Sequence, residues 1–201
     1  MRQRLGYDPD RPLIICAVGG TGIGHHLLRK TIDAWPLIRA QRPGARYWCR
    51  WTRWGKLTAG DRQDSADTVD GSVAVAGPRI DPASLPRHPG LEVRGYVPGL
   101  YEHLAVADLA IVQGGLATTM ELTITRRPFL YFPLAGHFEQ LYHVAHRLDA
   151  HRAGQRLAYQ DTNADALADA ALQALETDTT GYRQHRPGAA RRAASLIAEL
   201  L

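Results

Sequence analysis

The feature that most constrains this chain is residues 107–140, where short apolar runs alternate with glycines and a helix-forming segment. Residues 109–112 and 129–132 are apolar runs of strand length, and residues 116–125 between them are expected to be helical. Strands that alternate with helices are typical of parallel sheets. The sequence therefore predicts an α/β fold, a Rossmann-like parallel sheet flanked by helices.

A glycine pair ends the first of these strands. Gly114 and Gly115 have no Cβ, so a ligand can approach the backbone closely at this turn. The first N–H groups of the helix that follows point at whatever lies above the turn. Such a place at the end of a parallel strand favours a phosphate.

A second glycine-rich turn lies near the N-terminus. Residues 13–18 form an apolar run, which is followed by Gly-Gly-Thr-Gly-Ile-Gly at 19–24 and by an amphipathic segment at 25–41. Strand, glycine turn and helix is the arrangement that a phosphate-binding loop requires, although the GK[ST] of a P-loop is absent. The alternative interpretation is a tight strand-to-helix turn without a ligand.

The run QGGLATTMEL, followed by RRPFLYFP and HFEQ, resembles the nucleotide-sugar signature of GT-B glycosyltransferases, and above all of the MurG-type and related UDP-glycosyltransferases. One position departs from the family pattern, because Gln113 stands where the family usually has His or Arg. The residues that fall on the pattern are Gly114, Gly115, Thr118, Glu121, Pro128, Pro133, Glu139 and Gln140.

The resemblance implies a site for the donor nucleotide-sugar. Both glycine turns would hold the diphosphate, Glu121 would accept hydrogen bonds from the ribose, and the loop of Val97 would place main-chain groups against the uracil. His137, Glu139 and Gln140 would contact the sugar or phosphate. The expected donor-binding residues are Gly20, Thr21, Gly22, Val97, Gln113, Gly114, Gly115, Thr118, Glu121, His137, Glu139 and Gln140.

By the same resemblance, the chain is one half of a GT-B enzyme, a single domain over residues 1–201 with a leading linker at 1–12 and an inserted loop at 45–72. It implies metal-independent and inverting transfer by a hexosyltransferase-type enzyme, with a UDP-sugar as substrate and no cofactor. No general base stands out, so an N-terminal acceptor-binding domain or partner subunit would be needed for activity. Two alternatives stay open: a non-catalytic nucleotide-sugar-binding module, which the uncharged Gln113 favours, and a sugar-nucleotide epimerase.

Charge and composition constrain the remaining classes. The net charge of +4 and the pI near 9.3 are compatible with an anionic ligand or a peripheral membrane contact. Arginines alternate with aromatic residues between 46 and 56, which can bind single-stranded nucleic acid, but we favour a strand with a solvated loop and expect no nucleic-acid partner. No apolar run approaches the ~20 residues that span a bilayer, and residues 1–12 are unlike a signal peptide, so we expect a cytoplasmic protein. Zinc binding by His143 and His146 is disfavoured, because only His137 is near enough in sequence to act as a third ligand.

Overall fold

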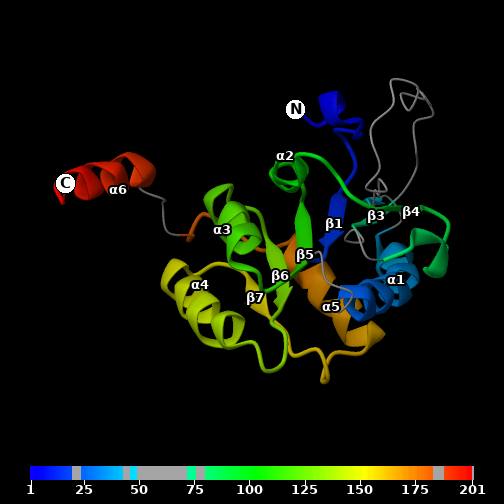
Figure 1. Ribbon diagram of the computed structural model, residues 1–201. Coiled ribbons are helices and arrows are strands. Elements are labelled where there is room, and N and C mark those ends of the chain that lie inside the picture. The colour runs from blue at the N-terminus through cyan, green and yellow to red at the C-terminus, as the bar shows by residue number, and fades with distance from the viewer. Residues whose placement is uncertain (20–23, 43–45, 49–71, 76–79, 183–187, 201) are drawn as a thin grey trace.

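A computed structural model of the chain describes all residues except 20–23, 43–45, 49–71, 76–79, 183–187 and 201. Its centre is a parallel sheet in the order β2-β4-β3-β1-β5-β6-β7, with an additional pairing between β2 and β1 (Figure 1). The strands are β1 (Leu13–Ala17), β2 (Arg46–Trp48), β3 (Ser72–Val75), β4 (Leu91–Arg94), β5 (Leu109–Gln113), β6 (Phe129–Phe132) and β7 (Gln155–Arg156).

Helices cover both faces of this sheet. Helices α1 and α5 pack against each other on one face, and α2, α3 and α4 lie on the other (Figure 1). The α-helices are α1 (Gly24–Gln41), α2 (Leu100–Leu104), α3 (Leu116–Ile124), α4 (Ala145–His151), α5 (Ala164–Leu175) and α6 (Ala189–Ala198). Short 3-10 helices span Gln3–Leu5 and Pro82–Ser84, and a π-helix spans Glu139–Val144.

The core is formed where the central strands meet the helices. Every residue of β1, β5 and β6 is buried, as expected for a parallel sheet covered on both faces. The buried side of α1 presents Leu28, Ile32 and Ile38, all fully buried. Pro36 lies inside α1 without ending it, since the helix continues to Gln41. The predicted α/β class is confirmed.

Strands β2 and β3 occupy one strand position in succession. β2 pairs with residues 13–15 of β1, and β3 pairs with residues 15–17 of the same strand. Leu91 at the start of β4 is a register partner of both strands. Residues 49–71, which lie between the two strands in sequence, are outside the described residues. The segment predicted as an inserted loop, 45–72, contains β2 and the first residue of β3.

Two local features follow β6. A π-helix begins at Glu139 and continues as α4. Strand β7 comprises Gln155–Arg156, and Leu157 N after it still donates to the carbonyl oxygen of Tyr131 in β6 at 3.0 Å. Further on, Lys30 Nζ donates to the carbonyl oxygens of Tyr159 and Thr162 and also lies over the Tyr159 ring.

The leading segment packs against the sheet. Arg2 Nε donates to the carbonyl oxygen of Val106, and its guanidinium forms an ion pair with Asp108. Asp108 also accepts from the backbone N–H of Leu13 at 2.6 Å. Tyr7 is buried, with its hydroxyl 2.6 Å from His103 Nδ1. Residues predicted as a linker thus hold the starting ends of β1 and β5 together.

Candidate donor-binding site

Three loops meet at one edge of the sheet. They follow β1, β5 and β6, which are neighbours in the sheet and run in the same direction. Their carboxyl ends therefore lie side by side, at the edge where open α/β sheets bind ligands. The loops begin at Gly19, Gly114 and Pro133, and two of them lead into the N-termini of α1 and α3.

The turn between β5 and α3 is the best-defined part of this edge. Gly114 is buried, and a Cβ added there would lie 3.1 Å from the Cα of Pro133. Gly115 precedes α3 as its N-cap with φ −69° and ψ 134°, and a Cβ there would meet nothing within 4 Å. No side chain caps the start of α3. The first N–H groups of the helix are thus left for water or a ligand.

Two glutamines close the space beside this turn. Gln113, the last residue of β5, is 8% exposed, and its Oε1 accepts a hydrogen bond from Gly19 N at 2.8 Å. Gln140 is 9% exposed, and its Oε1 accepts from Leu134 N at 2.9 Å. The sequence did not show these partners: Gly19 lies in another loop, and Leu134 lies six residues before Gln140 in the segment after β6.

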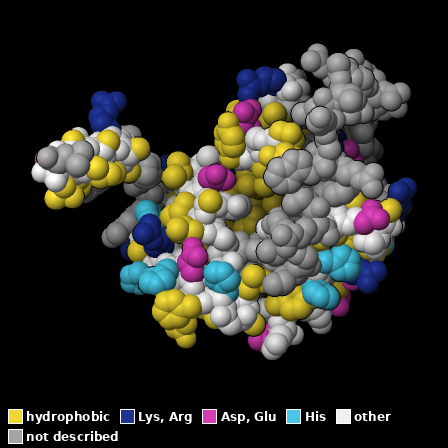
Figure 2. Space-filling view, in the orientation of Figure 1, with side chains coloured by type: hydrophobic (Ala, Val, Ile, Leu, Met, Phe, Trp, Pro, Cys, Tyr) yellow, Lys and Arg dark blue, Asp and Glu magenta, His cyan; other side chains and the backbone are white. Residues whose placement is uncertain are grey.

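Glu121 lies one to two turns into α3. The residue is exposed, and no other described residue lies within hydrogen-bonding distance of its carboxylate. Desolvation raises the pKa of this carboxyl group, so part of its surroundings is less polar than water. Thr118, one turn earlier, is half-buried. In Figure 2, acidic side chains lie over α3 and α4, beside a hollow with hydrophobic side chains on its floor.

The other predicted residues are distributed around the same edge. Val97 is buried in the turn after β4, and its side chain belongs to the core. His137 and Glu139 are exposed in the loop after β6 and at the start of the π-helix. The predicted loop residues Gly20, Thr21 and Gly22 lie outside the described residues.

Two features of this edge were missed in the sequence. Thr119 is fully buried, and its Oγ1 donates to the carbonyl oxygen of Gly115, which fixes the start of α3. His25 and His26 follow the first glycine loop at the start of α1, with ring centroids 5.8 Å apart. Burial, and then the nearby charges of Arg29 and His26, lower the pKa of His25. Thr119 lies in the segment that was expected to be helical, so its position on the helix could have been read from the sequence. No sequence signal pointed to His25.

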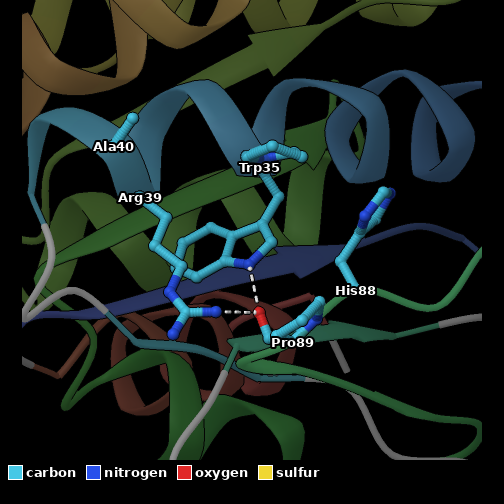
Figure 3. Close-up of a pocket in the computed structure, with 6 residues that line it drawn as sticks. Trp35, Arg39, Ala40, His88 and Pro89 are labelled. Carbon is cyan, nitrogen blue, oxygen red and sulfur yellow. Dashed lines mark hydrogen bonds between the residues drawn. The ribbon is translucent and has the colours of Figure 1, made fainter.

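A separate cleft of ≈ 400 Å³ lies at the opposite end of α1 (Figure 3). Its lining residues are Trp35, Pro36, Arg39, Ala40, His88 and Pro89. Trp35 Nε1 and Arg39 Nη1 both donate to the carbonyl oxygen of Pro89, at 3.2 and 2.7 Å. Their donors are thus used within the protein, and none of the predicted donor-binding residues lines this cleft.

The described residues offer neither a metal-binding cluster nor a helix that could span a membrane. These residues hold no group of three or more His, Cys, Asp or Glu side chains arranged to bind a metal ion. Among the helices that the structure describes, none is long and apolar enough to cross a membrane. The expectations of metal-independent chemistry and of a cytoplasmic location stay predictions.

Comparison with known proteins agrees with this geometry. Residues 80–200 match the model of the glycosyltransferase family 28 C-terminal domain. This match covers more than half of the chain and includes the turn at Gly114 and the loop at residues 133–140. The fold and the site define a GT-B-type glycosyltransferase domain. The chain belongs to the glycosyltransferase family 28 C-terminal domain family.

Individual relatives show the same relationship. An uncharacterized glycosyltransferase of Methanopyrus kandleri is 30% identical over 202 residues, which is 100% of this chain and 49% of that protein. The chain therefore spans about half the length of the curated relative that it matches. The calicheamicin glycosyltransferase CalG4 superposes with a TM-score of 0.62 at 17% identity, covering 96% of this chain and 43% of that one. MurG of Acinetobacter baumannii superposes with a TM-score of 0.60 at 17% identity, covering 98% of this chain and 52% of that one.

A third solved structure contains a nucleotide. The spinosyn rhamnosyltransferase SpnG, complexed with thymidine diphosphate, gives a TM-score of 0.58 at 19% identity, covering 99% of this chain and 45% of that one. At these identities the likeness shows the fold alone. Together with the family match, it confirms the predicted GT-B resemblance.

Proposed function

We propose that this chain is the donor-binding half of a GT-B glycosyltransferase and that its site binds a nucleoside diphosphate sugar, with UDP as the expected nucleotide. The observation that carries this proposal is the turn from β5 to α3. Gly114 and Gly115 leave room for close approach, and the uncapped start of α3 offers backbone N–H groups to a diphosphate. The complex of SpnG with thymidine diphosphate supports a nucleotide in a protein of this fold.

Each polar group at the edge has a role in this proposal. The N–H groups of α3 and the helix dipole stabilise the negative charge of the diphosphate, also when it departs as the leaving group. Glu121 accepts hydrogen bonds from the two ribose hydroxyls. Glu139 and His137 are exposed beside this turn and contact the sugar. The transfer inverts the anomeric carbon and uses no metal, and the acceptor and its general base are supplied by another domain or subunit.

Calorimetric titration of the purified chain with UDP and then with UDP-sugars tests the proposal. We expect micromolar to low-millimolar binding. Glu121→Ala removes a charged hydrogen-bond acceptor and should weaken binding by about tenfold or more. Glu199→Ala is the matched control, because Glu199 is an exposed glutamate at the end of α6. A wild-type chain that binds neither UDP, TDP nor GDP would contradict the proposal for the chain by itself.

A second candidate function is a nucleotide-sugar-binding module without turnover. Gln113 favours it, because an uncharged amide stands where the resemblance places His or Arg, and an amide stabilises a leaving diphosphate less than a cation does. An assay of glycosyl transfer, run on the chain mixed with a candidate N-terminal half, separates the two functions. Transfer above that of either half alone supports the enzyme, and nucleotide binding without transfer for any such half supports the module.

A further inference from the structure

Two buried glutamines lie where the loops of the proposed donor site begin, and one of them, Gln113, connects two of these loops. This connection joins the loop after β1 to the end of β5. Gly19 N donates to Gln113 Oε1 at 2.8 Å, and a Cβ added to Gly19 would lie 3.1 Å from the same oxygen. A backbone N–H can only donate, so the amide oxygen, and not the NH₂ group, must face Gly19. The loop therefore begins directly against Gln113.

Gln140 makes a local contact beside the β5–α3 turn. Its Oε1 accepts from Leu134 N, six residues earlier in the segment after β6, at 2.9 Å. A Cβ on Gly114 would lie 3.3 Å from this oxygen and 3.1 Å from Pro133 Cα. Gln140 therefore fixes the segment after β6 close to Gly114, the residue that follows Gln113.

Gly24, the first residue of α1, also packs against the end of β1. A Cβ added to Gly24 would lie 2.6 Å from Cβ of Val18, the residue after β1. Gly24 is thus placed by packing, and Gly19 by a hydrogen bond. Without Gln113, the N–H of Gly19 would lose its partner at the start of the loop.

We propose that Gln113 is a positioning residue: its side-chain oxygen holds Gly19, the first residue of the loop after β1, against the end of β5 beside the β5–α3 turn. The inference rests on the proposed function, because the loops would be positioned for a nucleoside diphosphate. A glutamine suits this role because its oxygen accepts at every pH without adding charge beside a phosphate. A histidine at this position would lose its acceptor nitrogen on protonation.

The NH₂ groups of the two glutamines define the competing role. Neither group has an acceptor among the described residues. Gln113 Nε2 could therefore contact a ligand directly. The experiment has to separate a role of the oxygen from a role of the nitrogen.

Four variants make this separation. Gln113→Met keeps the length of the side chain and removes both groups. Gln113→Glu keeps an acceptor for Gly19 and removes the donor. Gln113→Asn keeps both groups and is one methylene shorter, and it serves if the methionine variant does not fold. Gln173→Met, at an exposed position of α5, is the control.

The readouts are amide exchange at Gly19, measured by NMR without ligand, and calorimetric titration with UDP. We expect Gly19 to exchange about tenfold faster in Gln113→Met and Gln113→Asn, as for the loss of one hydrogen bond to a buried group, and UDP affinity to fall about five- to tenfold. Gln113→Glu should keep the slow exchange of Gly19, and Gln173→Met should change neither quantity.

Two results would overturn the inference. One is unchanged exchange at Gly19 in both Gln113→Met and Gln113→Asn. The other is weaker UDP binding in Gln113→Met with unchanged exchange, which would assign a direct contact to the NH₂ group. The exchange measurement needs no ligand, so a wild-type chain that fails to bind UDP would contradict the proposed function and leave the positioning of Gly19 open to this same test.

Discussion

Glu121 is exposed, and yet the pKa of its carboxyl group is shifted from the ordinary value. Desolvation raises its pKa in the folded chain, so the folded state disfavours the ionised form. The free energy of unfolding therefore decreases as the pH rises from the ordinary value near 4.5 through the raised folded value. A group that lowers stability when charged, at the edge of a proposed ligand site, is typical of functional residues.

Glu121→Gln tests this reading by opposite changes in stability and binding. At pH 7 the melting temperature should rise slightly, by less than about 3 °C, since the residue is largely exposed. Well below pH 4 the gain should disappear, because the wild-type carboxyl group is then protonated in both states. UDP affinity should fall at pH 7. A variant that melts lower than wild type at pH 7 would contradict the assignment.

His25 makes a second pH-dependent contribution. Burial first, and then Arg29 and His26, lower its pKa below the ordinary 6.5. The unfolded chain therefore binds a proton to His25 before the folded chain does, and stability is lost as the pH falls through 6.5 toward the lower folded value. We expect His25→Gln to lose less melting temperature than wild type between pH 7.5 and 5.5. His146→Gln, at an exposed position of α4, is the control and should behave as wild type.

At the scale of elements, the turn between β5 and α3 shows how much of the site the sequence predicted. The strands on either side, the glycine pair and α3 follow from local patterns, because apolar runs and glycines act on the backbone where they occur. The π-helix at Glu139 was not predicted, since its hydrogen bonds depend on how the chain packs and have no distinct sequence pattern. The contact of Lys30 with the carbonyl oxygens of Tyr159 and Thr162 was not predicted either, because it joins residues more than a hundred positions apart.

The two glycines of this turn should respond differently to alanine. In Gly114→Ala the new Cβ would crowd the backbone of Pro133, and we expect a loss of about 1–3 kcal/mol in the free energy of unfolding. In Gly115→Ala the new Cβ has open space and a favourable φ, so stability should be unchanged. Chemical denaturation measures both values.

The same pair tests the ligand site. Gly115→Ala should weaken UDP binding although it leaves the fold intact, because its Cβ would occupy the space over the start of α3. Unchanged UDP affinity in Gly115→Ala would show that the nucleotide does not approach this turn.

On the scale of the whole molecule, the packed body ends at Tyr182. Tyr182 is buried, and its hydroxyl accepts from Gly154 N at 3.1 Å. By contrast, α6 has no buried residue, and Leu196 and Ile197 are 60% and 61% exposed. Helix α6 also projects from the body in Figure 1.

Removal of residues 183–201 should therefore leave the melting temperature within about 1 °C of the full chain, since residues 188–200, the described part of this segment, are all exposed. Tyr182→Phe, which leaves Gly154 N without this acceptor, should lower stability by about 1–2 kcal/mol. Thermal unfolding of the truncated chain and of Tyr182→Phe, measured beside wild type, tests both expectations. A large loss on truncation would mean that α6 packs against the body in solution.

The sequence by itself determined the order of strands and helices along the chain, the two glycine turns and the GT-B resemblance, because these depend on neighbouring residues. The tertiary structure decided which groups meet. Gln113 and Gly19 are 94 positions apart, and Lys30 is more than a hundred positions from the carbonyl oxygens of Tyr159 and Thr162 that it contacts. The first of these contacts depends on β1 and β5 being neighbours with their carboxyl ends at one edge. That order is set by the packing of the whole sheet, which no local pattern specifies.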